Sequence, residues 1–233
     1  MNRVPLHEIL LEQVATERRR LSRRGLFGTT AKVAGGGALA LTMVGLPTVG
    51  RTVFAQDATP EGEEDDAPFA DDIEVLNYAL TLELLENAFY RDGLPVVGDL
   101  GTDGFDFSIS EQLAEIGSHE AAHVTVLTDT IVSLGGEPVQ EATYNFEDAF
   151  ASPAAFLMTA AALENTGVQA YNGAGQYISD PGLLTAAGSI VSVEARHASY
   201  LNLVNDESPF PSAFDEDLTP DEVLEIAGPF IAS

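Results

Sequence analysis

Hydrophobic residues recur at helical spacing in four long stretches of the chain. The stretches cover residues 71–91, 110–134, 153–177 and 181–204, and their apolar residues largely stand three or four positions apart. No segment of the sequence sustains the alternation of apolar and polar residues that is typical of a half-buried strand. The pattern therefore predicts an all-α protein with four helices of the length found in helix bundles.

Capping residues mark where these helices begin. Ser110-Glu111 opens the second stretch, and Gly135-Gly136 closes it. The third and fourth stretches begin at Ser152-Pro153 and Asp180-Pro181, where an N-cap residue precedes a proline in the first helical position. Thr219-Pro220 repeats this signal near the end of the chain, which predicts an additional short C-terminal helix.

The connection between the second and third helices is long. Residues 136–151 are too many for a tight hairpin, but at about 3.3 Å each they can run the length of a 25-residue helix, about 37 Å. The chain would then return to its starting end, and the second and third helices would be parallel. We therefore expect a four-helix bundle with one long crossover.

The N-terminal part of the sequence has the pattern of an export signal. A basic cluster at residues 18–24 precedes a mostly small and apolar stretch, residues 31–49, and Val53-Phe54-Ala55 is suitable for a signal peptidase. Ser22-Arg23-Arg24-Gly25-Leu26-Phe27 resembles a twin-arginine motif. The alternative is an uncleaved membrane anchor, which the glycine run at 35–37 disfavours. We predict a signal at 1–55, an acidic linker at 56–70 and a bundle domain at 71–233.

The charge distribution narrows the classes of partner. The chain carries 37 acidic and 10 basic side chains, for a net charge of −27, and only Arg91 and Arg196 of the basic residues follow residue 51. Binding to nucleic acid relies on lysine and arginine, so we expect no nucleic-acid partner. There is no cysteine, which excludes disulfides, iron–sulfur centres and thiolate zinc sites.

Acidic and tyrosine residues recur together on the first and third helices. Glu83 precedes Tyr90 by seven residues, and Glu164 precedes Tyr171 by the same spacing. Seven residues make two helical turns, so each glutamate and its tyrosine share one helix face. Both glutamates lie in strongly apolar sequence, which favours a position facing the inside of the bundle.

The second and fourth helices each carry a glutamate with a histidine three residues later. These pairs are Glu120 with His123 and Glu194 with His197, and residues at this spacing can reach one ion. Carboxylate and imidazole ligands suit iron or manganese, and four carboxylates balance the charge of two divalent cations. With Glu83 and Glu164, the two pairs predict a dinuclear metal site inside the bundle.

Three assignments have alternatives. Glu86, one turn after Glu83, is a rival ligand on the first helix. His119 is interpreted as a residue beside the ligands or on the surface. Tyr90 and Tyr171 are either ordinary core tyrosines that bond a ligand carboxylate or residues that take part in catalysis.

These motifs together resemble the ferritin-like superfamily, and within it the exported ferritin-like or desiccation-related proteins. The resemblance covers about residues 70–206 and is carried by Leu76-Asn77-Tyr78-Ala79-Leu80 through Tyr90, Ser118-His119-Glu120 through His123, Leu134-Gly135-Gly136-Glu137-Pro138, Tyr144-Asn145-Phe146, Leu163-Glu164 through Ala174, and Glu194 through Leu201. It implies six metal ligands, Glu83, Glu120, His123, Glu164, Glu194 and His197. Glu120 and Glu194 would be the bridging ligands, and Tyr90 and Tyr171 would stand beside the site.

The resemblance also implies a function. We expect two bound iron ions, or alternatively two manganese ions, that react with O2 or peroxide in protection against oxidative or desiccation stress. A bundle without catalytic activity that protects or buffers metal is the alternative. The signal implies an extracellular, periplasmic or cell-surface location with no stable membrane association after cleavage, and a homo-oligomer remains open.

Overall fold

The computed structural model describes residues 67–232, which form five α-helices and one turn of 3₁₀-helix. The elements are α2 (Asp72–Gly93), α3 (Ile109–Ser133), α4 (Pro153–Gly175), α5 (Pro181–Val204), α6 (Pro220–Ala227) and η1 (Gly228–Phe230). Within this range there are two isolated β-bridges and no strand, so the predicted all-α class with a short C-terminal helix is confirmed. The predicted export signal and most of the predicted linker lie outside the described residues.

The predicted capping residues start three of the helices. Ser152, Asp180 and Thr219 each accept a hydrogen bond from a backbone N–H in the first turn of α4, α5 and α6. The prediction for α3 was wrong by two residues, because Ser108 rather than Ser110 is the N-cap. The Ser108 backbone stays extended, and its Oγ accepts the N–H of Glu111 at 3.3 Å.

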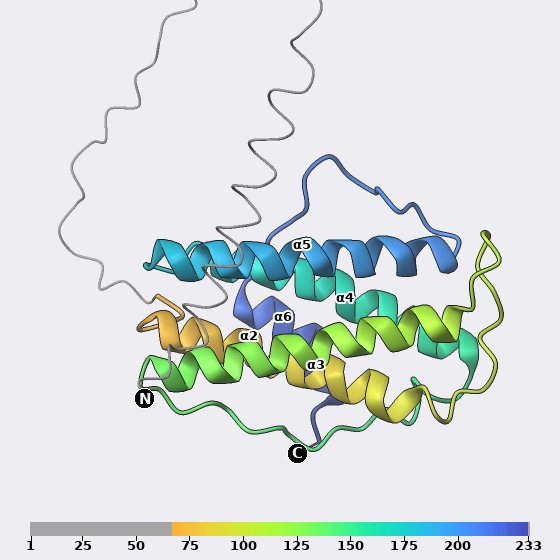
Figure 1. The fold of residues 1–233 in the computed structure, drawn as a ribbon, viewed down its shortest axis with the longest axis horizontal. Coiled ribbons are helices and arrows are strands. Elements are labelled where there is room, and N and C mark those ends of the chain that lie inside the picture. The colour runs from red at the N-terminus through yellow and green to blue at the C-terminus, as the bar shows by residue number, and fades with distance from the viewer. Residues whose placement is uncertain (1–66, 233) are drawn as a thin grey trace, which may run out of the picture. The chain divides into compact units, whose positions relative to one another are not determined.

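The four long helices form a bundle made of two antiparallel pairs (Figure 1). Helix α2 pairs with α3, and α4 pairs with α5. The connection at residues 134–152 runs from one end of the bundle to the other, so α3 and α4 point in the same direction (Figure 1). This is the predicted topology with one long crossover.

The crossover is fixed along the outside of α2. Asn77 donates to the carbonyl oxygen of Glu137 at 3.2 Å and accepts the N–H of Val139 at 2.8 Å. Near the C-terminal end of α2, the Arg91 guanidinium contacts the Glu141 carboxylate at 2.9 Å. These contacts at both ends of α2 hold the crossover in an extended path.

Two apolar clusters fill the bundle on either side of its middle. One contains Phe89, Leu113 and Phe156, from the end where α2 finishes and α3 and α4 begin. The other contains Leu80 and Ile131, from the opposite end. The buried acidic and histidine residues come from the middle of the four helices, between these clusters. Apolar packing therefore closes both ends of the polar centre.

The segment that precedes α6 packs tightly on α4, and this contact can be tested with matched glycine substitutions. Leu218 donates its N–H to the Gln169 carbonyl oxygen at 3.2 Å, and a Cβ on Gly173 would lie 2.0 Å from the Leu218 oxygen. We expect Gly173→Ala to lower the free energy of unfolding by about 1–3 kcal/mol, because backbone must move. Gly188→Ala in α5 meets no atom within 4 Å and should stabilise the helix by up to about 1 kcal/mol. Thermal unfolding of both variants measures the difference, and equal stabilities would contradict this packing.

Candidate metal centre

The six predicted ligands meet in the middle of the bundle. Each of the four long helices contributes, and the residues are Glu83 from α2, Glu120 and His123 from α3, Glu164 from α4, and Glu194 and His197 from α5. The four glutamates are 0% exposed, and the two histidines are 9% and 5% exposed. Four carboxylates at full burial need compensating positive charge.

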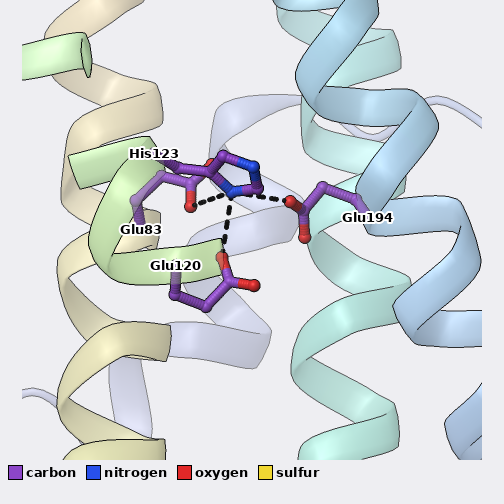
Figure 2. Close-up of side chains that lie close together, drawn as sticks. All are labelled: Glu83, Glu120, His123 and Glu194. Atoms are coloured by element: carbon purple, nitrogen blue, oxygen red, sulfur yellow. Dashed lines mark hydrogen bonds and ion pairs between the residues drawn. The ribbon is translucent and has the colours of Figure 1, made fainter. Parts of the chain in front are cut away.

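One group of donors surrounds His123 (Figure 2). The Nδ1 atom of His123 lies 3.2 Å from Glu83 Oε2, 3.2 Å from Glu120 Oε2 and 3.0 Å from Glu194 Oε1. These three carboxylates come from three different helices, so the group ties α2, α3 and α5 together around one point.

A second group surrounds His197. Its Nδ1 atom lies 3.0 Å from Glu120 Oε1, 3.1 Å from Glu164 Oε2 and 3.7 Å from Glu194 Oε2. In each group the ligand atoms all lie within 4.8 Å of one another, and Glu120 and Glu194 belong to both groups. The arrangement is compatible with two adjacent cations that share these two carboxylates.

Hydrogen bonds reach only some of the carboxylate oxygens in the two donor groups. A single N–H on Nδ1 cannot point at three carboxylate oxygens at once, and Glu120 Oε1 and both Glu194 oxygens have no hydrogen-bond partner although a histidine nitrogen is near. Buried acceptors of this kind require an explanation. A metal ion accepts ligands from several directions, and mixed carboxylate and imidazole donors suit iron or manganese. The residues therefore fit the metal pair that the sequence predicted.

The electrostatics of the group separate its carboxylates into two kinds. Burial raises the pKa of Glu83 and Glu164 well above the ordinary carboxyl range. Burial acts on Glu120 in the same direction, but its close contacts with His123 and His197 outweigh burial and lower its pKa to about 2. Burial alone would lower the pKa of the histidines, whereas the surrounding carboxylates raise both, His123 and His197, to about 12. The carboxylates therefore favour positive charge at both histidine positions.

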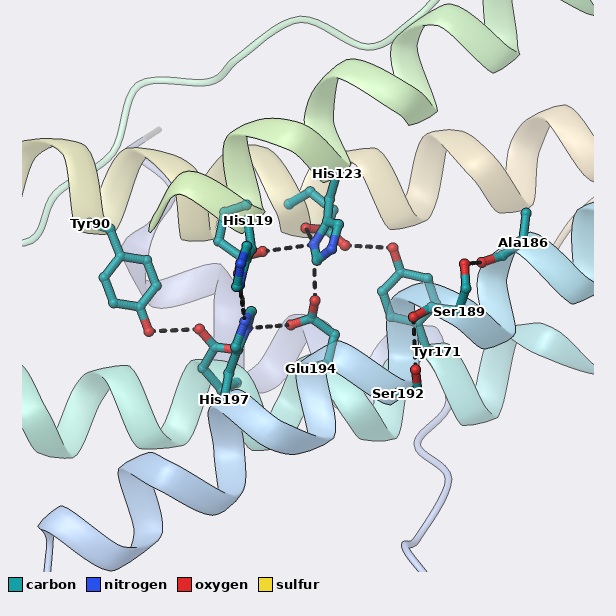
Figure 3. Close-up of polar contacts among 12 residues, drawn as sticks. Tyr90, His119, His123, Tyr171, Ala186, Ser189, Ser192, Glu194 and His197 are labelled. Carbon is teal, nitrogen blue, oxygen red and sulfur yellow. Dashed lines mark hydrogen bonds and ion pairs between the residues drawn. The ribbon is translucent and has the colours of Figure 1, made fainter. Parts of the chain in front are cut away.

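The two tyrosines bond the glutamates of the opposite half of the bundle. Tyr90 on α2 donates to Glu164 Oε1 on α4 at 2.6 Å, and Tyr171 on α4 donates to Glu83 Oε1 on α2 at 2.5 Å. They lie on opposite sides of the site (Figure 3). The spacing within each helix placed the tyrosines on the correct face, but it could not show that the partners are exchanged. Their catalytic role stays a prediction.

His119 contacts a predicted ligand, which the sequence left open. Its Nδ1 atom lies 2.9 Å from His197 Nε2, and the two rings stack with centroids 5.2 Å apart (Figure 3). On the outer side, His119 Nε2 is 3.6 Å from the exposed Glu115 carboxylate. When His119 accepts the Nε2 proton of His197, the Nδ1 atom of His197 is left free to bind a metal. The spacing of four residues between His119 and His123 was the signal in the sequence for this shared face.

The site has an opening between α3 and α5. A cavity of about 320 Å³ is lined by His119, Ala122, His123, Val193, Arg196 and His197. Its walls include both imidazoles of the candidate ligands, so this is the side from which small molecules can approach.

Glu86, the rival first-helix ligand, is also buried but belongs to neither donor group. The geometry therefore favours Glu83 as the residue from α2 that faces His123.

The fold and the site agree with a comparison to protein-family models. Residues 71–207 match the family described as the ferritin-like domain, which is more than half of the chain. The chain therefore belongs to the ferritin-like domain family. No curated protein matches it. None of the helices in residues 67–232 is both long and apolar enough to cross a membrane.

Metal binding at this site should release protons, so the apparent affinity should rise with pH. The surrounding carboxylates raise the pKa of both histidines to about 12, and burial raises the pKa of Glu83 and Glu164 above the usual range. A metal must displace these protons to reach the ligand lone pairs. Anaerobic titration with Mn²⁺ between about pH 6 and about pH 8 should show affinity rising roughly tenfold per pH unit for each proton released. An affinity that does not change with pH would contradict this account.

Proposed function

We propose that this protein is an exported ferritin-like oxidoreductase with a dinuclear iron centre, or alternatively a dinuclear manganese centre, that reacts with O2 or peroxide. The observation that carries the proposal is the pair of buried donor groups, which come from all four helices and share Glu120 and Glu194. The proposed ligands are Glu83, Glu120, His123, Glu164, Glu194 and His197.

The protein's own residues would prepare this site in three ways. When bound, a pair of reduced iron or manganese ions supplies two electrons for the reduction of O2 or peroxide. Glu120 and Glu194 face both donor groups and would bridge them. Tyr90 and Tyr171 hold the carboxylates of Glu164 and Glu83 in place by hydrogen bonds. Burial raises the pKa of both phenols, so each keeps a proton beside its carboxylate. The apolar clusters exclude water from the ends of the site.

Electrons for repeated turnover would come from another molecule. The chain has no cysteine, so it cannot hold an iron site of the kind that thiolates form. The opening between α3 and α5 is the side on which a small reductant or oxidant could reach the histidines.

We further propose a role in oxidative or desiccation stress outside the cytoplasm. The support is the twin-arginine motif at residues 22–27 and its resemblance to exported ferritin-like proteins. Such a pathway is generally taken to carry proteins that are already folded, which suits a centre assembled before export.

A bundle that buffers metal or stabilises other components without turnover is the second candidate. One observation favours it: the two histidines contact the buried carboxylates directly, with Nδ1 to oxygen distances of 3.0–3.7 Å. The histidines can therefore share in balancing the charge of these carboxylates, and the fold alone does not require catalysis.

Replacing a shared carboxylate separates these candidates. Glu194→Gln keeps the size of the side chain but removes one negative charge from both donor groups, so we expect it to lower metal affinity at least tenfold. Iron-dependent O2 uptake should fall with it. Elemental analysis and an oxygen electrode measure the two quantities, and Glu225→Gln, an exposed acid on α6, is the control for loss of charge. Wild-type protein that binds two iron ions but consumes no O2 or peroxide would support buffering and contradict the oxidoreductase.

The tyrosine that bonds Glu83 can be tested separately. Tyr171→Phe removes only the hydroxyl that donates to Glu83 Oε1. We expect metal affinity to fall roughly 10- to 100-fold, as for other residues that orient a ligand. Isothermal titration with Mn²⁺ measures the change. Tyr177→Phe, at the end of α4, is a matched control, and an equal effect in both variants would argue against a role at the site.

A further inference from the structure

Glu86 is a buried carboxylate that the six-ligand site does not use. It lies one turn after Glu83 on α2 and is 3% exposed. Among residues 67–232, no hydrogen bond or ion pair reaches its carboxylate. An acidic side chain this deeply buried without an ion-pair partner is costly to keep charged, so Glu86 calls for an explanation.

The carboxylate of Glu86 occupies space that α4 leaves empty. A Cβ placed on Gly167 would lie 3.1 Å from Glu86 Oε1 and 3.8 Å from Glu194 Oε2. Both oxygens therefore lie within 4 Å of the position that a Cβ of residue 167 would occupy. Because residue 167 is a glycine, this position holds no atom. The Glu86 carboxylate therefore lies on the same side of α4 as the shared carboxylate of Glu194.

The two helical hairpins, α2–α3 and α4–α5, differ at the residue three positions after the first glutamate ligand. Gly167 follows Glu164 by three residues, as Glu86 follows Glu83. One half supplies an acid and the other supplies the room for it. Besides burial, the largest influence on the pKa of Glu86 is the charge of Glu164, followed by that of Glu194, and all three effects raise it. The Glu194 oxygen beside Gly167 is Oε2, which lies 3.7 Å from His197 Nδ1, so Glu86 lies on the side of the second donor group.

We propose that Glu86 is a seventh ligand of the metal centre, which joins the second donor group from the space beside Gly167 when metal binds. The inference rests on the proposed function. Its oxygens lie outside both compact donor groups, so metal binding would recruit it. Five carboxylates carry one negative charge more than two divalent ions balance, so the site would suit a pair in which one ion is trivalent.

Glu86→Gln tests the proposal directly. The amide has the same shape but is a much weaker ligand, so we expect the weaker of two Co²⁺ sites to lose affinity roughly tenfold or more. The visible absorption bands of the bound Co²⁺ should also change, because they report coordination number and ligand type. The thermal stabilisation gained on adding Co²⁺ should fall in proportion to the lost affinity. Glu225→Gln controls for the loss of one charge.

Gly167→Ala tests the same contact from the other helix. The new methyl group would meet Glu86 Oε1 at 3.1 Å, whereas its distance to Glu194 Oε2 is ordinary contact. We expect weaker Co²⁺ binding in the wild-type background. In a Glu86→Ala background the same substitution should have no further effect on binding, because the obstructed group is gone.

The outcomes are distinguishable. A Glu86→Gln variant that unfolds at higher temperature without metal, yet keeps wild-type Co²⁺ affinity and absorption, would show that Glu86 is a buried acid with no part in the centre and would overturn the inference. Unchanged Co²⁺ binding by Gly167→Ala would also count against it. If wild-type protein binds no Co²⁺, the proposed function itself fails, and the comparison with Glu194→Gln reveals this independently.

Discussion

The burial of several carboxylates in an apolar helix bundle is the constraint on which the rest of the structure depends. Within residues 67–232 no lysine or arginine makes an ion pair with these carboxylates, and the two imidazoles are the positive groups that contact them. Each histidine has to face three glutamates at once, so the helices must approach at one level. The apolar clusters at both ends then keep water from those ends, and burial strengthens the charge interactions between them.

The topology follows from the same requirement. Each donor group combines residues from α2–α3 with residues from α4–α5, so both hairpins must present the middle of their helices to one another. The long crossover makes this possible because it returns the chain to the starting end and lets the second hairpin repeat the first. Asn77 and Arg91 hold that crossover on the outer face of α2, away from the charged centre.

Much of this arrangement could be predicted from the sequence, because helical periodicity converts spacing directly into a shared face. The i and i+3 pairs and the repeated seven-residue spacing placed the six donors correctly inside the bundle. Contacts between helices do not follow from spacing within one helix. For this reason the exchanged tyrosines, the ring contact between His119 and His197, and the fit of Glu86 against Gly167 needed coordinates. The start of α3 was misplaced by two residues because the cap depends on backbone geometry: Ser108 is extended, and its side chain accepts the N–H of Glu111.

Each of the two tyrosines bonds a glutamate of the other hairpin, so the site is complete only when both hairpins are packed together. Neither hairpin on its own contains a complete ion-binding pocket, since Glu83 depends on a hydroxyl from α4 and Glu164 depends on one from α2. A nascent chain that has made only its first two helices would therefore present isolated acids with weak attraction for cations. Tight binding of a cation would then require that both hairpins have packed together, so only the fully folded bundle would bind one.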